Sequence, residues 1–192
     1  MPNTRMFFLI AILASLAAFT ALAFDRPSFS HGRTIPAAGT VELAFTPDDD
    51  ADRMVISAID HAQQQILVQA YSFTDENIAH ALIKANKRGL DVQLIADAEQ
   101  TEKTWPNVVS EIAASGIPTY LDSQHQSAHS KIMVIDAGTT HSAVITGSFN
   151  FTYAAQFKNA ENLLILRNNP EISTAYLQNW KHHLSHSLRF HR

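Results

Sequence analysis

The sequence contains no cysteine, which excludes disulfide bridges and thiolate chemistry. It also lacks an excess of positive charge, because 14 lysines and arginines stand against 18 aspartates and glutamates, for a net charge of −4. Proteins that bind DNA without sequence preference are usually basic, so this balance argues mildly against a nucleic-acid partner, although net charge does not reveal a local basic groove. No internal repeat or low-complexity tract is present, which favours a single domain.

The first 23 residues are typical of a secretory signal peptide. Arg5 precedes an apolar stretch from Met6 to Ala18, and Ala21-Leu22-Ala23 supplies the small residues that signal peptidase requires. An uncleaved membrane anchor is the alternative, but the apolar run is short for a membrane span, so the sequence favours cleavage and a bacterial periplasmic or secreted protein. Loss of Arg5 would change the net charge from −4 to about −5.

After an extended leader at 24–40, which is rich in Pro, Gly and Ser, predicted strands alternate with predicted helices. The predicted strands are 41–45, 66–73, 90–97, 116–122 and 161–168. One predicted helix opens at Thr46-Pro47, and three others cover 74–89, 105–115 and 170–184. The segment 129–152 is typical of an antiparallel hairpin that turns at Ala137-Gly138. We therefore expect one α/β domain at 41–192 with a mixed, largely parallel sheet flanked by helices.

Three charged or titratable groups interrupt the apolar run AHSKIMVID at 128–136. In a strand alternate side chains share a face, so His129 and Lys131 point to one face and Asp136 to the other. A histidine and a lysine on one face can meet the same anion, because lysine offers a positive charge to a phosphate while imidazole can attack phosphorus or pass protons. The alternative is a strand end whose polar residues simply reach solvent.

Polar residues after the hairpin favour the phosphate site. Ser148 and Asn150 alternate and could both donate hydrogen bonds to the same oxygens, and Gly147 would let the backbone approach a ligand. Glu161 opens the next strand, where a carboxylate could hold the second imidazole nitrogen and stabilise the imidazolium. Taken singly these residues are typical of turns and strand edges, but together they favour a phosphate pocket.

These residues resemble a known family. His129, Lys131 and Asp136 match the H-x-K-x4-D motif of the phospholipase D superfamily, and its G-S-x-N sequence follows at 147–150. The segments ILVQAYSFTDENIAHALIKANKRGLDVQLIAD (66–97) and DSQHQSAHSKIMVIDA (122–137) resemble the small secreted bacterial endonucleases of that superfamily, which carry one motif per chain. The resemblance extends from about residue 41 to residue 180.

The resemblance implies a metal-independent phosphodiesterase that needs no cofactor. In the family, two copies of the motif meet at one active site. One histidine attacks phosphorus to give a covalent phosphohistidine, the other protonates the leaving oxygen, and water resolves the intermediate. His129 would supply both histidines if two chains shared one site, so a homodimer with a two-fold axis through the site is implied.

The resemblance also implies roles for the other motif residues. Lys131, Ser148 and Asn150 would bind the non-bridging oxygens of the phosphate. Glu161 would orient the nucleophilic imidazole, and Asp136 would have a more structural, charge-pairing role.

Three functions remain open on the sequence. The first is an exported, sequence-nonspecific endonuclease that acts on DNA, with RNA as a further candidate substrate. The second is a phospholipase D or phosphatidyl transferase that acts on lipid phosphodiesters, against which the mature chain shows no long apolar or basic amphipathic segment. The third is a catalytically silent binding module, which the complete set of motif residues disfavours.

Other candidate residues have simpler explanations. His182 and His186 stand four apart on the last predicted helix and could share a metal, but no nearby carboxylate completes the set, so a solvated helix end is favoured. His125 is a candidate for the rim of the pocket. Trp105 and Tyr71 could stack bases, but Tyr71 is expected in the core.

Overall fold

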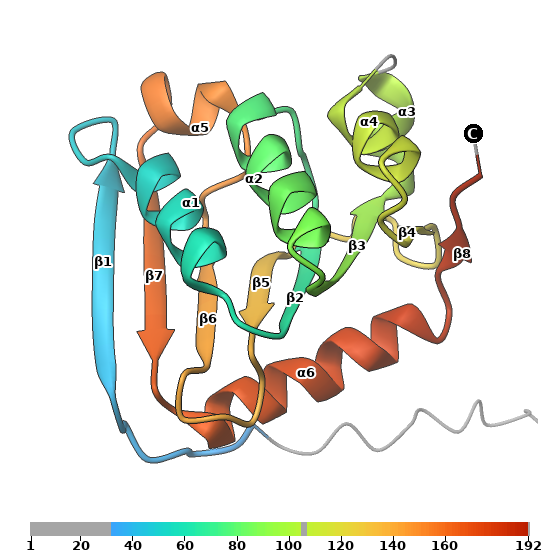
Figure 1. The fold of residues 1–192 in the computed structure, drawn as a ribbon. Coiled ribbons are helices and arrows are strands. Elements are labelled where there is room, and N and C mark those ends of the chain that lie inside the picture. Colours follow the sequence, from blue (N-terminus) through green and yellow to red (C-terminus); the bar gives the residue numbers. More distant parts are fainter. Residues whose placement is uncertain (1–31, 105–106, 192) are drawn as a thin grey trace, which may run out of the picture. The chain divides into compact units, whose positions relative to one another are not determined.

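Runs of β-branched and apolar residues form the strands of one eight-stranded sheet within the described part of the chain. The computed structural model describes residues 32–104 and 107–191, so the predicted signal peptide and Trp105 lie outside the described residues, and 32–39 carry neither helix nor strand. The strands are β1 (Thr40–Thr46), β2 (Gln65–Ala70), β3 (Asp91–Asp97), β4 (Thr119–Asp122), β5 (Lys131–Ile135), β6 (Ala143–Gly147), β7 (Glu161–Arg167) and β8 (Leu188–Arg189). Their spatial order is β1-β7-β6-β5-β2-β3-β4-β8 (Figure 1).

The sheet is mixed, as expected, but the expectation that it is largely parallel is wrong. Only β2, β3 and β4 are parallel to one another in the described part of the chain, with α2 between β2 and β3 and with α3 and α4 between β3 and β4. The other five pairings are antiparallel, including the predicted hairpin of β5 and β6. After residue 122, some connections are too short for a crossover between parallel strands, and others carry the chain back across the sheet. Antiparallel pairing is the result.

Helices cover both faces of the sheet (Figure 1). They are α1 (Ala51–His61), α2 (Glu76–Lys87), α3 (Ala98–Lys103), α4 (Val108–Ala114), α5 (Tyr153–Phe157) and α6 (Pro170–Leu184). The helices α1 and α2 lie side by side over one face, and α6 crosses the other face. The helix predicted at 170–184 has the predicted bounds, because Asn169 caps it and Pro170 occupies its first turn.

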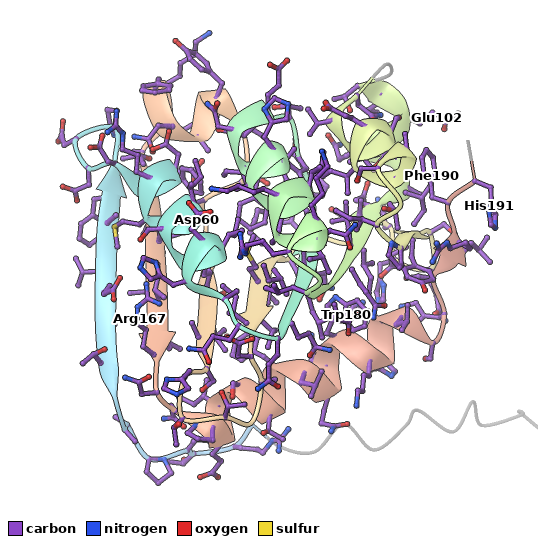
Figure 2. All side chains as sticks on the ribbon, in the orientation of Figure 1. Asp60, Glu102, Arg167, Trp180, Phe190 and His191 are labelled. Atoms are coloured by element: carbon purple, nitrogen blue, oxygen red, sulfur yellow. The ribbon has the colours of Figure 1, made fainter. Side chains whose placement is uncertain are left out.

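The two faces of the sheet have separate cores. The larger core joins the sheet to α1, α2 and α4, and Met133 and Ile135 of β5 point into it. The smaller core lies under α6 and contains Ile132 and Val134 of the same strand together with Trp180. Trp180 is 2% exposed, and its indole N–H donates to the carbonyl of Val68 (Figure 2). Loss of a buried tryptophan of this kind typically costs about 3–5 kcal/mol.

Two helix predictions need correction. The first helix begins at Ala51 rather than at Thr46-Pro47, because Thr46 still pairs with Glu161 in the sheet and the carboxylate of Asp49 accepts from the N–H of Phe45 in a turn. The short helices α3 and α5 were not predicted, since five or six residues give too little periodicity to detect.

The hairpin connection is longer than the predicted Ala137-Gly138 turn and covers 136–142. It starts at Asp136, which has a φ of 48°. The Gly138 N–H donates to the hydroxyl of Ser173, so the connection is held against α6.

The chemistry-bearing residues lie at one edge of the sheet, which here means the row formed by the ends of neighbouring strands and not an outermost strand. The strands β5 and β7 begin at this edge, and β2, β3, β4 and β6 end there, as their pairing shows. His129, which directly precedes β5, and Glu161, which opens β7, therefore belong to the same edge. Among the described residues, no helix combines the length and the apolar character that crossing a membrane requires.

Candidate active site

His129 and Lys131 lie side by side, as the alternation predicts. The Nζ of Lys131 lies 2.9 Å from Nδ1 of His129 and donates to the His129 carbonyl at 2.6 Å. The strand β5 begins only at Lys131, so His129 belongs to the loop before the strand and is exposed, whereas Lys131 is 5% exposed. An accessible imidazole beside a buried ammonium is suited to an anionic substrate.

Tyr71 belongs to this site, so the expectation that it is a core residue is wrong. Its ring lies 4.3 Å from the ring of His129, and the Nζ of Lys131 lies 4.7 Å from its centroid. The N–H of Tyr71 donates to the carbonyl of Ser130, and the side-chain amide of Gln100 donates to its hydroxyl. Tyr71 thus holds both motif side chains in place from the neighbouring strand.

Burial changes the acidity of Lys131. Loss of hydration lowers the pKa of Lys131 from 10.5 to about 8, although the negative charge of Glu161 raises it in part. Glu161 is therefore close enough to act electrostatically on the ammonium. The ammonium remains protonated at neutral pH but loses its proton far more readily than an exposed lysine.

The segment Gly147–Phe151 runs along the same edge of the sheet. It leaves β6, which is next to β5, and reaches Phe73 beyond the end of β2, which is on the other side of β5. The segment must therefore pass the beginning of β5, where His129 and Lys131 lie. Ser148 and Asn150 are brought to the site by this path.

The polar groups of this segment are available to a ligand. The hydroxyl oxygen of Ser148 accepts from the backbone N–H and the side-chain amide of Asn162, so its own hydrogen remains to be donated. The Oδ1 of Asn150 is buried, and no described group bonds to it. Because this oxygen accepts hydrogen bonds, a phosphate would be bound by the NH₂ group of the same amide and not by Oδ1.

Gly147 has a different role from the one predicted. With φ at 143°, a Cβ here would lie 2.3 Å from the backbone oxygen of Asn162. That oxygen accepts from the N–H groups of both Ser148 and Phe149. Gly147 therefore permits close approach of two strands of the protein.

Glu161 does not hold the imidazole as expected. Its carboxylate accepts from the side-chain amide of Asn159 at 2.9 Å, and within the described residues no hydrogen bond joins it to His129. The Nδ1 of His129 faces Lys131 instead. When the ammonium donates to Nδ1, the imidazole proton resides on Nε2, which is the form of a proton donor. A nucleophilic Nε2 requires Nδ1–H to be held by a carboxylate.

Asp136 lies at the opposite edge of the sheet, about 16 Å along β5 from Lys131. Its carboxylate, which is 3% exposed, accepts from the backbone N–H groups of Gln63, Gln64 and Gln65 at 2.7–2.9 Å. The predicted structural role therefore fits, but the expected charge pairing is wrong because the partners are neutral amides. Asp136 fastens the turn between α1 and β2 and does not belong to the site.

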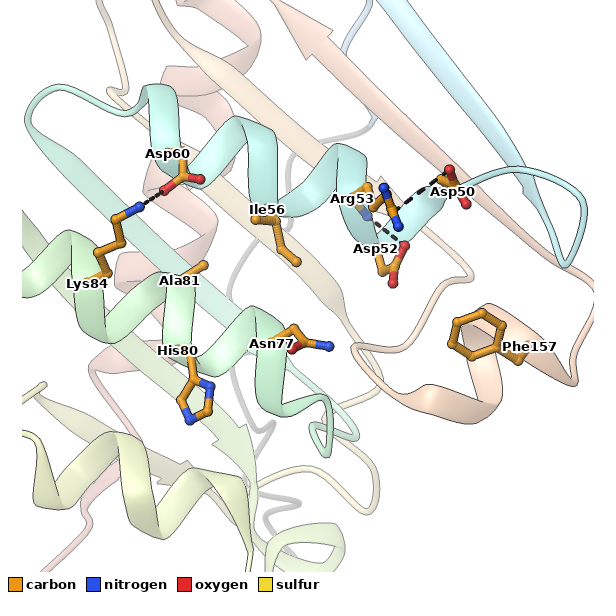
Figure 3. A pocket seen from close by; sticks show the side chains of 10 residues that line it. All are labelled: Asp50, Asp52, Arg53, Ile56, Asp60, Asn77, His80, Ala81, Lys84 and Phe157. Carbon is orange, nitrogen blue, oxygen red and sulfur yellow. Dashed lines mark hydrogen bonds and ion pairs between the residues drawn. The ribbon is translucent and has the colours of Figure 1, made fainter.

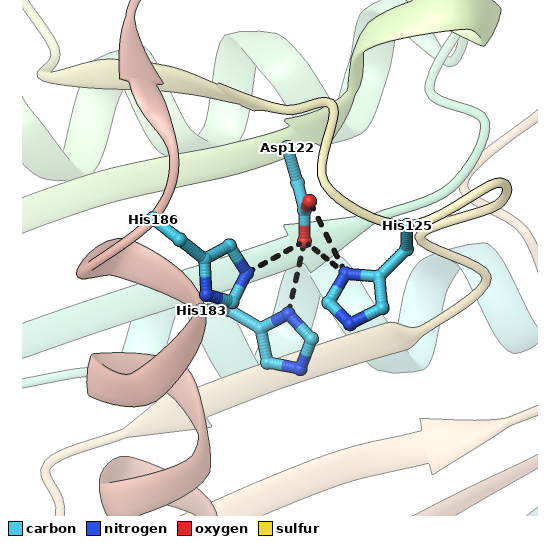
Figure 4. Close-up of side chains that lie close together, drawn as sticks. All are labelled: Asp122, His125, His183 and His186. Carbon is cyan, nitrogen blue, oxygen red and sulfur yellow. Dashed lines mark hydrogen bonds and ion pairs between the residues drawn. The ribbon is translucent and has the colours of Figure 1, made fainter. Parts of the chain in front are cut away.

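His125 points away from the predicted pocket rim, into a cluster with Asp122, His183 and His186 (Figure 4). Burial raises the pKa of Asp122, but hydrogen bonds from His183, His125, the Gln124 N–H and His186 together lower it to about 2. The expectation that His186 lies at a solvated helix end with no carboxylate nearby is therefore wrong, because Asp122 supplies that carboxylate. The spacings Asp122-x2-His125 and His183-x2-His186 are a sequence signal for a cluster of metal-ligating residues. Only the return of α6 across the sheet brings the two pairs together.

A hollow of about 620 Å³ between α1 and α2 contains none of the predicted site residues (Figure 3). Its charged side chains pair with one another, as in Asp60 with Lys84 and Asp50 with Arg53. The hollow therefore offers no set of groups for phosphate chemistry. The reactive groups lie instead at the edge of the sheet where β5 begins.

The chain is similar in sequence and fold to known proteins. A family model described as "Cardiolipin synthase, PLD-like domain" matches residues 55–184. A phospholipase D of Rickettsia felis is 36% identical over 140 residues, which cover 73% of this chain and 67% of the relative. The crystal structure of Nuc from Salmonella typhimurium, described as a phospholipase D family member, matches with a TM-score of 0.72 and 35% identity over 80% of this chain and 99% of that one. NucT from Helicobacter pylori has the same fold, with a TM-score of 0.71, 23% identity and coverage of 79% and 99%.

Proposed function

The chain belongs to the phospholipase D superfamily and is a phosphodiesterase, and from this premise we propose that it is an exported endonuclease that cleaves DNA as a homodimer. The observation that carries the proposal is the accessible imidazole of His129 next to the buried ammonium of Lys131 at an open sheet edge. RNA is a second substrate of the same chemistry.

The reaction proceeds in two displacements. The Nε2 of one His129 attacks phosphorus, a P–N bond forms, and the P–O bond to the leaving nucleotide breaks. The second histidine supplies the proton that the leaving oxygen takes up. Water then attacks the phosphohistidine, so that the P–N bond breaks and a phosphomonoester is released with the enzyme restored.

Lys131 connects substrate binding to activation of the imidazole. A phosphate anion draws the ammonium toward its non-bridging oxygens, which frees Nδ1 of His129 from its contact with Nζ. The carboxylate of Glu161 then holds the Nδ1–H, which leaves a lone pair on Nε2 for the attack. The hydroxyl of Ser148 and the amide of Asn150 bind the remaining charge on the phosphate.

The two histidines come from two chains. The motif occurs once in the sequence, and His129 in its described contacts has the proton arrangement of the acid, not of the nucleophile. A two-fold axis through the open edge would bring the partner subunit's His129 to the same phosphate. One imidazole then acts as nucleophile while the other acts as acid.

The structural match to Nuc and the motif pattern favour nucleic acid over lipid. This chain and Nuc correspond over 99% of the length of Nuc, and the sequence has the pattern of the small one-motif bacterial endonucleases. The lipid alternative is supported by a different observation, the name phospholipase D of the Rickettsia relatives. Lipid phosphodiesters are therefore the second candidate substrate.

One experiment compares the two candidates. The purified chain, without residues 1–23, is incubated with plasmid DNA or with phosphatidylcholine vesicles in excess EDTA. We expect the plasmid to be nicked and the lipid to remain intact, because the imidazole replaces a metal-activated water as nucleophile. The variant His129→Ala serves as the control for contaminating nucleases. Choline release without plasmid cleavage would contradict the nuclease, and activity that requires added Mg²⁺ would contradict the mechanism.

A further inference from the structure

Outside the active site, four potential metal ligands from two separate segments of the chain converge at one point (Figure 4). Asp122 ends β4, His125 follows in the next loop, and His183 lies in the last turn of α6 with His186 just beyond that helix. The carboxylate of Asp122 is fully buried, whereas the imidazoles of His183 and His186 are each 16% exposed and that of His125 is 45% exposed.

The distances in this cluster approach those of a tetrahedral metal site. The Oδ2 of Asp122 lies 2.9 Å from Nδ1 of His183, 3.1 Å from Nδ1 of His125 and 3.3 Å from Nε2 of His186. All four ligand atoms lie within 4.8 Å of one another. Metal–ligand bonds of about 2.0–2.1 Å in a tetrahedron place neighbouring ligand atoms about 3.3 Å apart. Small side-chain rotations would therefore suffice to enclose an ion.

The chemistry of the ligands specifies the class of ion. Three imidazoles and one carboxylate are typical ligands of Zn²⁺ and of related divalent transition metals, whereas Mg²⁺ and Ca²⁺ prefer oxygen ligands. With neutral imidazoles the set carries one negative charge, which a divalent cation more than neutralises. The exposed edges of the imidazoles give an ion access to the buried carboxylate.

We propose that Asp122, His125, His183 and His186 bind one Zn²⁺ ion that fastens the end of α6 to β4 and to the loop between β4 and β5. This loop ends at His129, and its other fixed point is the N–H of Ala128, which donates to the carboxylate of Asp97 at 2.8 Å. The ion therefore fastens the beginning of this loop, whereas the Ala128–Asp97 hydrogen bond fixes the end next to His129.

The ion takes no part in the chemistry. Across the sheet, Leu121 is in register with Lys131 through Ala96 and Ala70, so β4 lies three strands from β5, or about 14 Å. Asp122 faces α6, whereas Lys131 alternates with Ile132, which faces α6, and so points to the other face. Chelation should accordingly reduce stability and leave turnover intact.

Metal titration of the chain without residues 1–23 tests the proposal. After dialysis against chelator and then buffer, isothermal titration with ZnCl₂ should show one ion per chain. Free zinc at about 100 times the dissociation constant should raise the melting temperature by about 5–10 °C. Co²⁺ in the same site should show the intense visible absorption of tetrahedral coordination.

Two variants and a matched control locate the ion. His183→Gln should weaken zinc binding by more than tenfold, and Asp122→Asn should do the same if it folds, as judged by its melting curve without metal. His141→Ala, which removes an exposed histidine outside the cluster, should bind zinc like the wild type. Absence of stoichiometric binding would overturn the proposal, as would binding that survives His183→Gln, because the ion would then lie on other surface histidines.

Discussion

At the scale of single residues, the reactivity of the site is set by the ammonium of Lys131. It is buried next to the exposed imidazole of His129, and the ring of Tyr71 lies within 5 Å of both. Burial without a full counter-charge makes the ammonium easy to deprotonate, so it binds an incoming anion strongly. A phosphate would thus supply the negative counter-charge that the ammonium of Lys131 lacks.

The pH dependence of activity should show this property. Lysine is cationic below its pKa, so the charge of Lys131 in the free enzyme should be lost as the pH rises through about 8. We expect kcat/KM to fall above about pH 8, since this parameter reports the free enzyme. In Lys131→Arg this decline should disappear, because guanidinium stays charged, although the activity will be lower. A decline that begins only near the ordinary lysine pKa, or that persists in the arginine variant, would contradict the assignment.

Glu161 gives a second residue-scale prediction. Glu161→Gln retains the acceptor for Asn159 but removes the charge that stabilises the imidazolium, so kcat should fall about 100-fold or more while KM changes little. The same charge raises the pKa of Lys131, so the alkaline decline should also move to lower pH. Glu102→Gln, at an exposed position, is the control. A lower melting temperature with unchanged kcat per folded molecule would instead indicate a purely structural Glu161.

The sequence alone identified those residues of the site that lie close together within one strand or one motif. His129 and Lys131 are two apart in an extended segment, so their proximity follows from alternation alone. Tyr71 reaches them through the antiparallel pairing of β2 with β5, where Ala70 is opposite Lys131, and no local pattern specifies that pairing. The position of Glu161 beside Lys131 rather than His129 depends on side-chain geometry that spacing does not determine.

At the scale of elements, the strands and long helices were predictable from their periodicity, whereas sheet order was not. The helix α2 is capped by Asp75, whose carboxylate accepts from two N–H groups of the first turn, and Gly89 with φ at 94° follows its end. Such caps are local and can be recognised in a sequence. The return of α6 across the sheet, which brings His183 to Asp122, is a long-range event with no local signature.

Asp136 permits a test of stability without catalysis. In Asp136→Asn the amide oxygen can still accept hydrogen bonds, but the N–H that pairs with Oδ2, that of Gln63, loses its acceptor. We expect the free energy of unfolding to fall by about 1–3 kcal/mol. Asparagine tolerates the positive φ of this position, so backbone strain does not contribute.

Activity separates this role from a catalytic one. Asp136 lies at the opposite edge of the sheet from His129, so turnover per folded Asp136→Asn molecule should equal that of the wild type. Asp48→Asn, at an exposed position, should change the free energy of unfolding by less than about 0.5 kcal/mol. Loss of turnover in folded Asp136→Asn would place the residue in the catalytic machinery and contradict the account.

At the scale of the whole molecule, the proposed homodimer would need a contact surface near the edge of the sheet that carries the site. The helix α5 follows Asn150 at this edge and exposes Tyr153 and Phe157, which are 59% and 53% exposed. Their rings lie 4.6 Å apart and form an exposed apolar surface, and Phe157 also lines the hollow between α1 and α2. Exposed aromatic pairs of this kind are typical of interfaces, so this surface is a candidate contact of the proposed dimer.

The most direct test of the account is the activity of dimers that contain one wild-type chain and one His129→Ala chain. When equal amounts are refolded together, random pairing makes about one quarter of the dimers entirely wild type. Gel filtration, together with a different affinity tag on each chain, verifies that mixed dimers form. A shared site with two essential histidines predicts about one quarter of the activity of an all-wild-type sample, with none in the isolated mixed dimer. About one half of the activity, with mixed dimers confirmed, would show independent sites and contradict the account.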